Sequence, residues 1–338
     1  MVRFRLRAGR GTNLALLVLL IGALVTGGLA FAIGGEWAFW AFAAHGAVGL
    51  SLVLLAPWKS VVSARGLRRA RPGTSASVLL ALLVVITVAS GIAHAVGLWT
   101  TGLAMQVHVG AALLSIPLAI GHVVARPVRP RPSDLSRRGL LRAGAVAGGG
   151  IVAFGALEGL VQATGLAGSE RSATGSYERG SYDPVAMPVT QWLDDQPPEI
   201  DPADWRLFVR TAEGASTWSY EELAGFSDRV RATVDCTGGW FATQDWSGVR
   251  LDRLVGVDDA VRSVVVVSAT GYGRRFPISD AASMLLATRV GERPLSVGHG
   301  FPARLVAPGR RGFWWVKWIE RVETSQTPWW WQSPFPLT

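Results

Sequence analysis

The stretch Val78-Leu-Leu-Ala-Leu-Leu-Val-Val-Ile-Thr-Val-Ala-Ser-Gly-Ile-Ala-His-Ala-Val-Gly-Leu98 contains no charged side chain. A helix needs about 20 such residues to cross the hydrocarbon core of a membrane. Four further apolar runs accompany it: Leu14–Ile33, Ala38–Trp58, Leu103–Ala125 and Ala143–Leu157. The sequence therefore predicts an all-α bundle of five transmembrane helices, of which the last is Gly-rich and least hydrophobic.

Basic residues gather in alternate loops between these runs. They are Arg3, Arg5, Arg7 and Arg10 before the first run, Lys59, Arg65, Arg68, Arg69 and Arg71 after the second, and Arg126, Arg129, Arg131, Arg137, Arg138 and Arg142 after the fourth. The other two loops carry no Lys or Arg. The positive-inside rule then places the N-terminus in the cytoplasm and everything after the fifth run outside the cell membrane.

The formal net charge of +9 does not indicate a nucleic-acid-binding protein. From Glu158 onward the chain has 18 basic and 22 acidic residues, so the positive excess belongs to the loops between the apolar runs. A domain that binds nucleic acid would carry a basic patch of its own. We therefore expect no nucleic-acid partner, and we expect membrane lipid around the first half of the chain.

Two arginines precede the weakly apolar fifth run, in Ser136-Arg137-Arg138-Gly139-Leu140-Leu141. This arrangement resembles an internal twin-arginine export signal, and an ordinary positive-inside flank is the alternative. The twin-arginine route exports proteins already folded around a cofactor, so the signal predicts cofactor insertion into residues 205–338 before export. No clear Ala-x-Ala cleavage site follows, and the fifth run is expected to remain as an anchor.

The second half of the chain reads as a strand-rich α+β domain after a linker. Strands are expected at Trp205–Arg210, Arg231–Asp235, Ser263–Ala269 and Trp314–Val322, and short helices at Glu221–Phe226 and Ser279–Ala287. The chain is thus expected to be multi-domain: a four-helix bundle at 1–130, the signal-like segment and fifth helix at 131–165, a linker at 166–204, the folded domain at 205–325 and a tail at 326–338.

The only cysteine lies in Val234-Asp-Cys-Thr-Gly-Gly-Trp240, so no disulfide can form within the chain. A free cysteine is most often a small buried hydrophobe. A lone thiol outside the membrane is nevertheless open to oxidation, and the following Gly-Gly allows backbone to approach a ligand closely. These features favour Cys236 as a metal ligand.

The cysteine segment, together with Trp246-Ser-Gly-Val-Arg-Leu251, resembles the molybdenum-binding segment of the sulfite oxidase family. A second stretch, His299-Gly-Phe-Pro-Ala-Arg-Leu-Val-Ala-Pro-Gly309 followed by Trp315-Val-Lys-Trp-Ile319, is similar to the family's His-Gly-x-Pro-x-Arg and Val-Lys-Trp motifs. The resemblance covers about residues 185–325. It implies a molybdopterin-dependent oxidoreductase.

The resemblance also implies roles for single residues. Cys236 would be the thiolate ligand of molybdenum, because a soft thiolate suits such a metal. The implied cofactor-binding residues are His299, Arg304, Lys317, Gly238 and Gly239, and the further catalytic candidates are Tyr272 and Arg274, for which a plain turn is the alternative. Eukaryotic sulfite oxidases follow the cysteine with a basic stretch, whereas Thr-Gly-Gly-Trp-Phe stands here. In that respect the chain looks more like the bacterial membrane-associated or periplasmic members, including methionine-sulfoxide reductases.

Four histidines fall in the apolar runs, and neutral imidazole is a good haem ligand. His45 and His108 open the two halves of a weak internal repeat, at similar depth on runs two and four. We expect them to bind one haem b near the outer face, with His94 as the reserve ligand. Lys59 occupies the position in the other half of the repeat that corresponds to His122, which leaves an inner haem site half lost.

Taken together, these features predict a membrane-anchored, extracytoplasmic molybdenum oxidoreductase. It would transfer an oxygen atom in a two-electron step to or from a small sulfite-type, S-oxide or N-oxide substrate. It would exchange electrons with a membrane haem and the quinone pool, or with a redox partner protein. Sulfite dehydrogenase and sulfoxide reductase types both stay open. The alternatives are a molybdenum enzyme with a haem-free membrane anchor and a non-catalytic cofactor-binding subunit.

Overall fold

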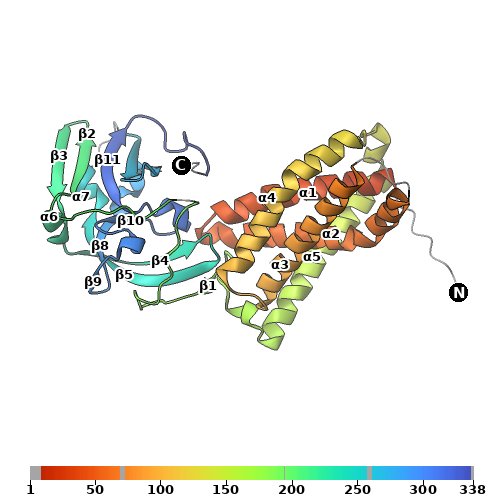
Figure 1. The fold of residues 1–338 in the computed structure, drawn as a ribbon, viewed down its shortest axis with the longest axis horizontal. Coiled ribbons are helices and arrows are strands. Elements are labelled where there is room, and N and C mark those ends of the chain that lie inside the picture. The colour runs from red at the N-terminus through yellow and green to blue at the C-terminus, as the bar shows by residue number, and fades with distance from the viewer. Residues whose placement is uncertain (1–8, 69–72, 194, 257–260, 336–338) are drawn as a thin grey trace. The chain divides into compact units, whose positions relative to one another are not determined.

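The computed structural model describes residues 9–68, 73–193, 195–256 and 261–335, and the chain divides into two compact units. The first is helical and the second is built from sheets (Figure 1). The basic residues Arg3, Arg5, Arg7, Arg69 and Arg71, which contributed to the topology prediction, lie outside the described residues.

Within the described residues, five long helices form the first unit. They are α1 (Arg10–Ala32), α2 (Ala38–Leu67), α3 (Thr74–Val96), α4 (Gly102–Ala125) and α5 (Arg137–Thr164), with short 3-10 turns η1 (Gly35–Trp37), η2 (Pro132–Leu135) and η3 (Ala167–Glu170). Each long helix is apolar and long enough to cross a membrane, and the five predicted helical runs are thereby confirmed as helices.

A glycine of the Gly-rich helix α5 allows this helix to pack closely on α2. Helix α3 packs along α4, and α2 packs along α5. A Cβ atom on Gly150 would lie 2.0 Å from the Ser51 hydroxyl and 2.4 Å from the Ala47 carbonyl, so only glycine permits this approach of α5 to α2. Ser51 also donates to the Val146 carbonyl of α5 at 3.3 Å. Small residues at helix contacts are the usual device for packing inside a membrane.

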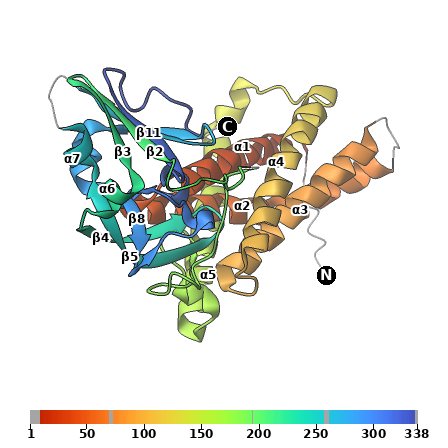
Figure 2. The same cartoon turned by 60° about the vertical axis from the view of Figure 1, so that its left-hand side comes forward.

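The second unit contains two sheets. Its strands are β1 (Tyr177–Glu178), β2 (Arg206–Thr211), β3 (Gly214–Ser219), β4 (Asp228–Cys236), β5 (Trp240–Arg250), β6 (Ser263–Ser268), β7 (Gly273–Pro277), β8 (Leu285–Val290), β9 (Arg293–Pro294), β10 (Arg304–Val306) and β11 (Ile319–Ser325). One sheet has the order β1-β5-β8-β10, with β4 paired to β5 and β9 to β8; the other has the order β3-β2-β11-β6-β7. Figure 2 shows β4, β5 and β8 as neighbours.

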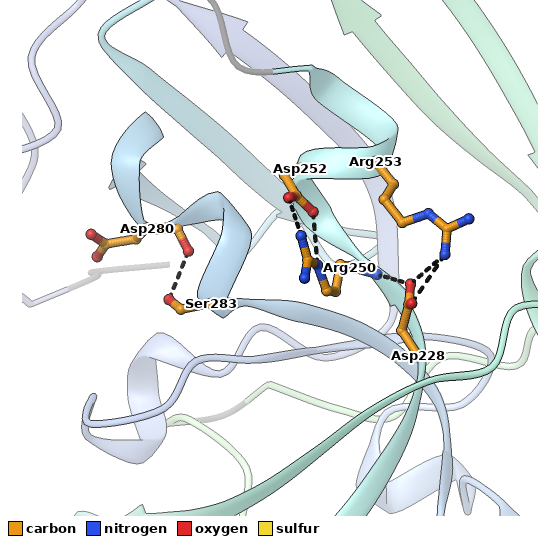
Figure 3. Close-up of polar contacts among 6 residues, drawn as sticks. All are labelled: Asp228, Arg250, Asp252, Arg253, Asp280 and Ser283. Atoms are coloured by element: carbon orange, nitrogen blue, oxygen red, sulfur yellow. Dashed lines mark hydrogen bonds and ion pairs between the residues drawn. The ribbon is translucent and has the colours of Figure 1, made fainter.

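Short helical turns connect these strands: α6 (Tyr220–Ala224), α7 (Leu251–Val255), η4 (Ile278–Ser283), η5 (Val297–His299) and η6 (Gly312–Trp314). Asp228 at the start of β4 holds α7, because it accepts from the Arg250 backbone at 2.9 Å and from Arg253 at 3.0 Å (Figure 3). Beside them Arg250 pairs with Asp252, and the Ser283 hydroxyl donates to the Asp280 carbonyl at 2.8 Å.

Two expectations about secondary structure are corrected. The strand expected at Trp314–Val322 begins only at Ile319, because η6 ends at Trp314 and residues 315–318 form neither helix nor strand. The helix expected at Ser279–Ala287 is η4 followed by the start of β8. Strand β8 pairs with β5, β9 and β10 and is buried on both faces, so its apolar run has no alternation to distinguish it from a helix. The strands expected around Trp205, Arg231 and Ser263 and the helix at Glu221 are present.

Part of the segment predicted as a linker packs onto the sheets. Tyr177 and Glu178 pair in parallel with Trp240 and Phe241 of β5, and the Tyr177 side chain is buried. This segment therefore belongs to the second unit, and it supplies residues to the site described next.

Candidate molybdopterin site

Cys236 ends β4, and a tight turn returns the chain to Trp240 at the start of β5. Gly239 in this turn has φ +85°, a left-handed conformation that favours glycine. The backbone amide of Gly238 donates to the Cys236 sulfur at 3.3 Å. The Gly-Gly pair thus shapes the turn. Both glycines were expected to contact the cofactor. Neither Gly238 nor Gly239 is among the described residues that line the adjoining pocket.

Cys236 lines a pocket of about 70 Å³ that opens to solvent. Burial raises the pKa of this thiol, while hydrogen bonds from Gly238 and Thr190 and the charge of Arg311 act in the opposite direction. Thr190 in turn accepts from the Trp240 indole at 3.0 Å. Within the described ranges, no three His, Cys, Asp or Glu side chains cluster as a metal site.

Gly300 brings the second motif together around the same pocket. Its φ is +107°, and a Cβ there would lie 2.9 Å from the Arg304 Cβ and 3.1 Å from the Lys317 Cβ. The turn η5 before it is capped by Ser296, whose hydroxyl accepts from the His299 amide at 3.3 Å. Only glycine at this point allows His299, Arg304 and Lys317 to converge, and all three line the pocket as expected.

Arg304 is a buried cation whose hydrogen bonding is incomplete within the protein. One of its terminal nitrogens donates to the His299 carbonyl at 3.2 Å, but its Nε has no partner and is buried. The guanidinium lies over Trp246 and Trp315, at 5.0 and 5.4 Å from their ring centroids. Burial lowers its pKa to about 10. An unpaired N–H of a buried cation fits an anionic group such as a phosphate.

Lys317 reaches across to the segment that precedes the predicted folded domain. Its ammonium donates to the Thr190 carbonyl at 2.9 Å, the Gln191 side chain at 2.8 Å and the Gly298 carbonyl at 2.7 Å. Burial, reinforced by the charge of Arg304, lowers the pKa of Lys317 to about 7. An anion bound in the pocket would favour the charged ammonium and raise this pKa again.

His299 has a more structural position than expected. Its two ring nitrogens lie 2.8 Å from the Ser296 hydroxyl and 3.1 Å from the Met187 carbonyl, so both are engaged within the protein. Burial, followed by the charges of Arg304 and Lys317, lowers its pKa and keeps the ring neutral. In the structure His299 joins the second motif to Met187, and it is one of the residues that line the pocket.

Tyr272 and Arg274, the two further catalytic candidates, lie in different places in the structure. The Tyr272 hydroxyl lies in the pocket wall and donates to the Phe313 carbonyl; burial raises its pKa, so it remains protonated. Arg274 is absent from the described lining residues. It stacks over Trp314 at 4.0 Å and donates to the Ser333 carbonyl at 3.1 Å, which fixes the C-terminal tail. The structure therefore brings Tyr272, and not Arg274, to the site.

Sequence reasoning missed two features of this site. The first is the segment containing Thr190, Gln191 and Trp192, which was assigned to a linker on its composition. The second is an ion pair beneath the cysteine, between Arg311 and Asp235. The only sequence signal for the pair was the charged residue directly before Cys236. The sequence did not reveal which cation pairs with Asp235, because Arg311 lies 76 residues away.

The pocket fits the cofactor that the motifs imply. A thiol stands at one side, and the orphaned Nε of Arg304 and the ammonium of Lys317 offer positive charge to a phosphate. The aromatic rings of Trp246 and Trp315 hold Arg304 in place. Molybdopterin, which carries both a metal and a phosphate, is matched by this set of groups.

The histidines of the first unit separate into a pair and two others. The rings of His45 and His108 lie 5.8 Å apart between centroids, nearly perpendicular. His94 faces two backbone carbonyls, Trp99 at 3.1 Å and Gly175 at 3.0 Å. His122 lies 2.9 Å from the Ser77 hydroxyl. The structure thus brings together the two residues expected to share a haem, and it gives the other two protein partners.

Comparisons with known proteins agree with the site. Residues 194–332 match the family described as "Oxidoreductase molybdopterin binding domain". Mitochondrial sulfite oxidase of Rattus norvegicus is 30% identical over 165 residues, covering 38% of this chain and 30% of that protein. The "Uncharacterized oxidoreductase YuiH" of Bacillus subtilis is 26% identical over 140 residues, covering 39% of this chain and 71% of that protein.

Among solved structures, the sulfane dehydrogenase SoxCD of Paracoccus pantotrophus matches with 26% identity and a TM-score of 0.37, covering 39% of this chain and 40% of that one. The chain spans about a third of the length of the sulfite oxidases that it matches. Residues 194–332 are therefore similar to the molybdopterin-binding domain of sulfite oxidases, and the family profile does not cover the helical first half of the chain.

Proposed function

We propose that this chain is a membrane-anchored, extracytoplasmic molybdenum oxidoreductase that transfers an oxygen atom to or from a small substrate. The observation that carries the proposal is one pocket in which the Cys236 thiol, the buried Arg304 with its unpaired Nε, and Lys317 converge. Retention of all three in one cavity argues against a non-catalytic subunit, which would need no metal ligand.

The molybdenum cofactor, when bound, would supply the two-electron chemistry. Reduction of an oxide consumes two electrons and two protons and yields the deoxygenated product and water, and oxidation has the reverse balance. The chain's own residues bind and orient. Cys236 would hold the metal, Arg304 and Lys317 would hold the phosphate end, and Tyr272 would keep its proton and fix the Phe313 wall.

The helical unit would supply the electron connection. The pairing of His45 with His108 supports one haem b held between α2 and α4. A similar environment surrounds each ring: a Cβ on Gly27 would lie 3.0 Å from the His45 ring, and one on Gly91 would lie 2.8 Å from the His108 ring. In each pair of helices, α1–α2 and α3–α4, a glycine of the first helix lies against a histidine of the second, and this similarity supports a duplicated hairpin. Electrons would pass to or from quinone, or to a redox partner protein.

The loop charges and the twin arginines support the proposed location. Arg137 and Arg138 are the first residues of α5, whose N-cap is Ser136. The sheet domain would fold around its cofactor in the cytoplasm and then cross the cell membrane, with α5 left as an anchor.

The test is purification of the full chain in detergent, followed by metal analysis, pterin analysis, a visible spectrum and anaerobic turnover. We expect molybdenum and pterin near one per chain, a haem b spectrum, and turnover coupled to a quinol or quinone analogue. Molybdenum without haem would support the haem-free anchor. A pterin-bound protein that turns over none of the substrates, with either quinone analogue, would support a binding subunit.

A further inference from the structure

At the end of the helical unit for which the loop charges predict a cytoplasmic location, two pairs of polar side chains join the first four helices. The Lys59 ammonium of α2 donates to the Asn13 side chain of α1 at 3.3 Å. The Nδ1 atom of His122 on α4 lies 2.9 Å from the Ser77 hydroxyl of α3. Polar and ionisable side chains are costly in apolar helices, so such a set marks a candidate functional site.

The internal repeat brings Lys59 and His122 to the same part of this end. Lys59 lies 14 residues after His45, and His122 lies 14 residues after His108. Fourteen residues are close to four helical turns, so each inner residue lies about 21 Å further along nearly the same face of its helix. Since His45 and His108 face each other, Lys59 and His122 lie near each other in turn, and the charge of Lys59 reaches His122.

A third basic side chain completes what we call the inner basic cluster. It is Arg126, the residue directly after the end of α4, and its charge reaches both Lys59 and His122. The Lys59 ammonium makes one hydrogen bond within the described structure, to Asn13, and therefore retains two N–H donors for a ligand. The cluster thus consists of Lys59, His122 and Arg126, from two helices.

The helical unit offers this cluster no carboxylate. Residues 1–133 contain a single acidic residue, Glu36, which precedes the start of α2, whereas Lys59 lies near the end of that helix. The next acidic residue, Asp134, accepts from Arg10 at 2.8 Å and from the Arg131 backbone at 2.8 Å. The positive charge of the cluster is therefore uncompensated among the described residues, and a bound anion would neutralise it.

Apolar side chains beside the cluster favour a lipid over a free ion as the source of this anion. Trp58, next to Lys59, and Val124, close to His122, are both exposed in the helical unit. A free phosphate ion would leave them uncovered, whereas the acyl chains of a phospholipid would cover them. Basic side chains between helices at the cytoplasmic side are typical binding sites for lipid headgroups.

We propose that the inner basic cluster binds the phosphate of an anionic phospholipid. Lys59 and Arg126 would donate to the phosphate oxygens, and His122 would contact the same group while Ser77 orients its ring. This site goes beyond the proposed oxidoreductase function and rests only on its placement of the helices in a membrane.

The test uses the full chain, purified in detergent and mixed with equal amounts of phosphatidylglycerol and phosphatidylcholine. Native mass spectrometry counts the lipids that remain bound, and we expect phosphatidylglycerol to be retained in preference. Lys59→Gln, which keeps an amide for Asn13, and Arg126→Gln should each reduce its retention by about fivefold, the worth of one cation near an anionic lipid surface. Arg142→Gln, at an exposed arginine of α5, is the matched control and should retain the lipid normally.

Inorganic phosphate gives the experiment a second arm, and we expect an excess of it to leave phosphatidylglycerol bound. Displacement of the lipid by inorganic phosphate would assign the cluster to a free ion and overturn the lipid site. Equal retention of the two lipids would also overturn it, as would normal retention in both cluster variants. Arg126 lies at a helix end, so its variant still decides the matter if Lys59→Gln does not fold. A preparation without molybdenum that retains phosphatidylglycerol as expected would refute the proposed function and leave this inference standing.

Discussion

Arg311 and Asp235 form an ion pair directly beneath the Cys236 turn, although they lie 76 residues apart in the chain. The Arg311 side chain is 4% exposed and also donates to the Cys236 carbonyl at 3.3 Å. Ser176 donates to the same Asp235 carboxylate at 2.7 Å. A Cβ on the neighbouring Gly312 would lie 3.1 Å from the Cys236 Cα. The pair therefore clamps the backbone that presents the thiol.

Removing one member of this pair should destabilise the sheet domain. In Arg311→Met the half-buried Asp235 carboxylate loses its cation, and we expect a loss of about 2 kcal/mol in the free energy of unfolding. Denaturant unfolding followed by tryptophan fluorescence measures it. Arg321→Met, at an exposed arginine whose carboxylate partner lies 3.5 Å away, is the matched control and should cost under about 1 kcal/mol. Equal midpoints for the two variants would contradict the clamp.

Cys236→Ser tests the proposed metal ligand. The hydroxyl is close in size to the thiol, so the fold should persist, and Arg304 and Lys317 should keep much of the pterin bound. Turnover should fall by more than about 100-fold, because a neutral hydroxyl does not replace a soft thiolate. Pterin content and turnover are measured on the same preparation. Thr233→Ser, on the exposed edge of the β4–β5 hairpin, serves as the control. Full activity of the serine variant would remove Cys236 from the metal.

Lys317 gives the cofactor-free protein a predictable pH dependence. Its pKa is about 7 in the folded chain, against an ordinary value of 10.5. Between these values the unfolded chain holds a proton that the folded chain has released, so stability rises with pH. From pH 7 to 9 the rise should approach about 1.4 kcal/mol per pH unit, and below pH 7 the penalty is constant.

Lys317→Met should abolish this slope, whereas Arg293→Met, on an exposed residue, should leave it. The window ends near pH 9, because the raised pKa of Cys236 then gives a slope of opposite sign. Addition of phosphate should flatten the slope in the unaltered protein, since a bound anion restores the pKa of Lys317. A slope that is identical in Lys317→Met and the unaltered protein would exclude Lys317 as its source.

The helices and the two motif segments were predictable from sequence because each depends on local composition. An uncharged run long enough for a membrane has few other uses. Residue type alone also made candidates of the Cys236 turn, Arg304 and Lys317. Trp192, which lines the same pocket, was not predicted, because it lies in a Pro- and Asp-rich stretch that looked like a linker. Earlier in the same stretch, Tyr177 pairs with Trp240 of β5, a contact across more than 60 residues that local sequence does not reveal. Arg274 stays a prediction as a catalytic residue, and its hydrogen-bond partners in the tail could not be predicted from local sequence.

The twin-arginine proposal predicts a separation between insertion and export. In a variant with Arg137→Lys and Arg138→Lys, the positive charge at the start of α5 is unchanged and the four preceding helices should still insert. The sheet domain should remain in the cytoplasm, protected from protease added outside. Arg129→Lys with Arg142→Lys is the matched control, and its sheet domain should be exported. Protease access to residues 205–338 in the first variant would refute the signal.

The last prediction concerns the haem. His45 on α2 and His108 on α4 face each other, and their ring centroids are 5.8 Å apart at an interplanar angle of 86°. If the two imidazoles held one haem between them, they would need to lie close together, and this pair does. Each ring already has one polar neighbour, Thr26 at 3.3 Å for His45 and the Thr87 carbonyl at 2.8 Å for His108. Those contacts orient a ligand ring by its second nitrogen.

Alanine at His45 or at His108 should therefore abolish the α-band of the reduced protein. Alanine at His122 should leave it, because His122 pairs with Ser77 and the Lys59 ammonium binds Asn13 at 3.3 Å. Alanine at His94 should also leave the band, since both of its ring nitrogens face backbone carbonyls. Gly27→Val and Gly91→Val offer a further check without touching a ligand. The new Cβ would lie 3.0 Å from the His45 ring in Gly27→Val and 2.8 Å from the His108 ring in Gly91→Val. Each variant should therefore shift or weaken the band. A band lost only with the His94 and His108 variants would move the haem to the α3–α4 hairpin.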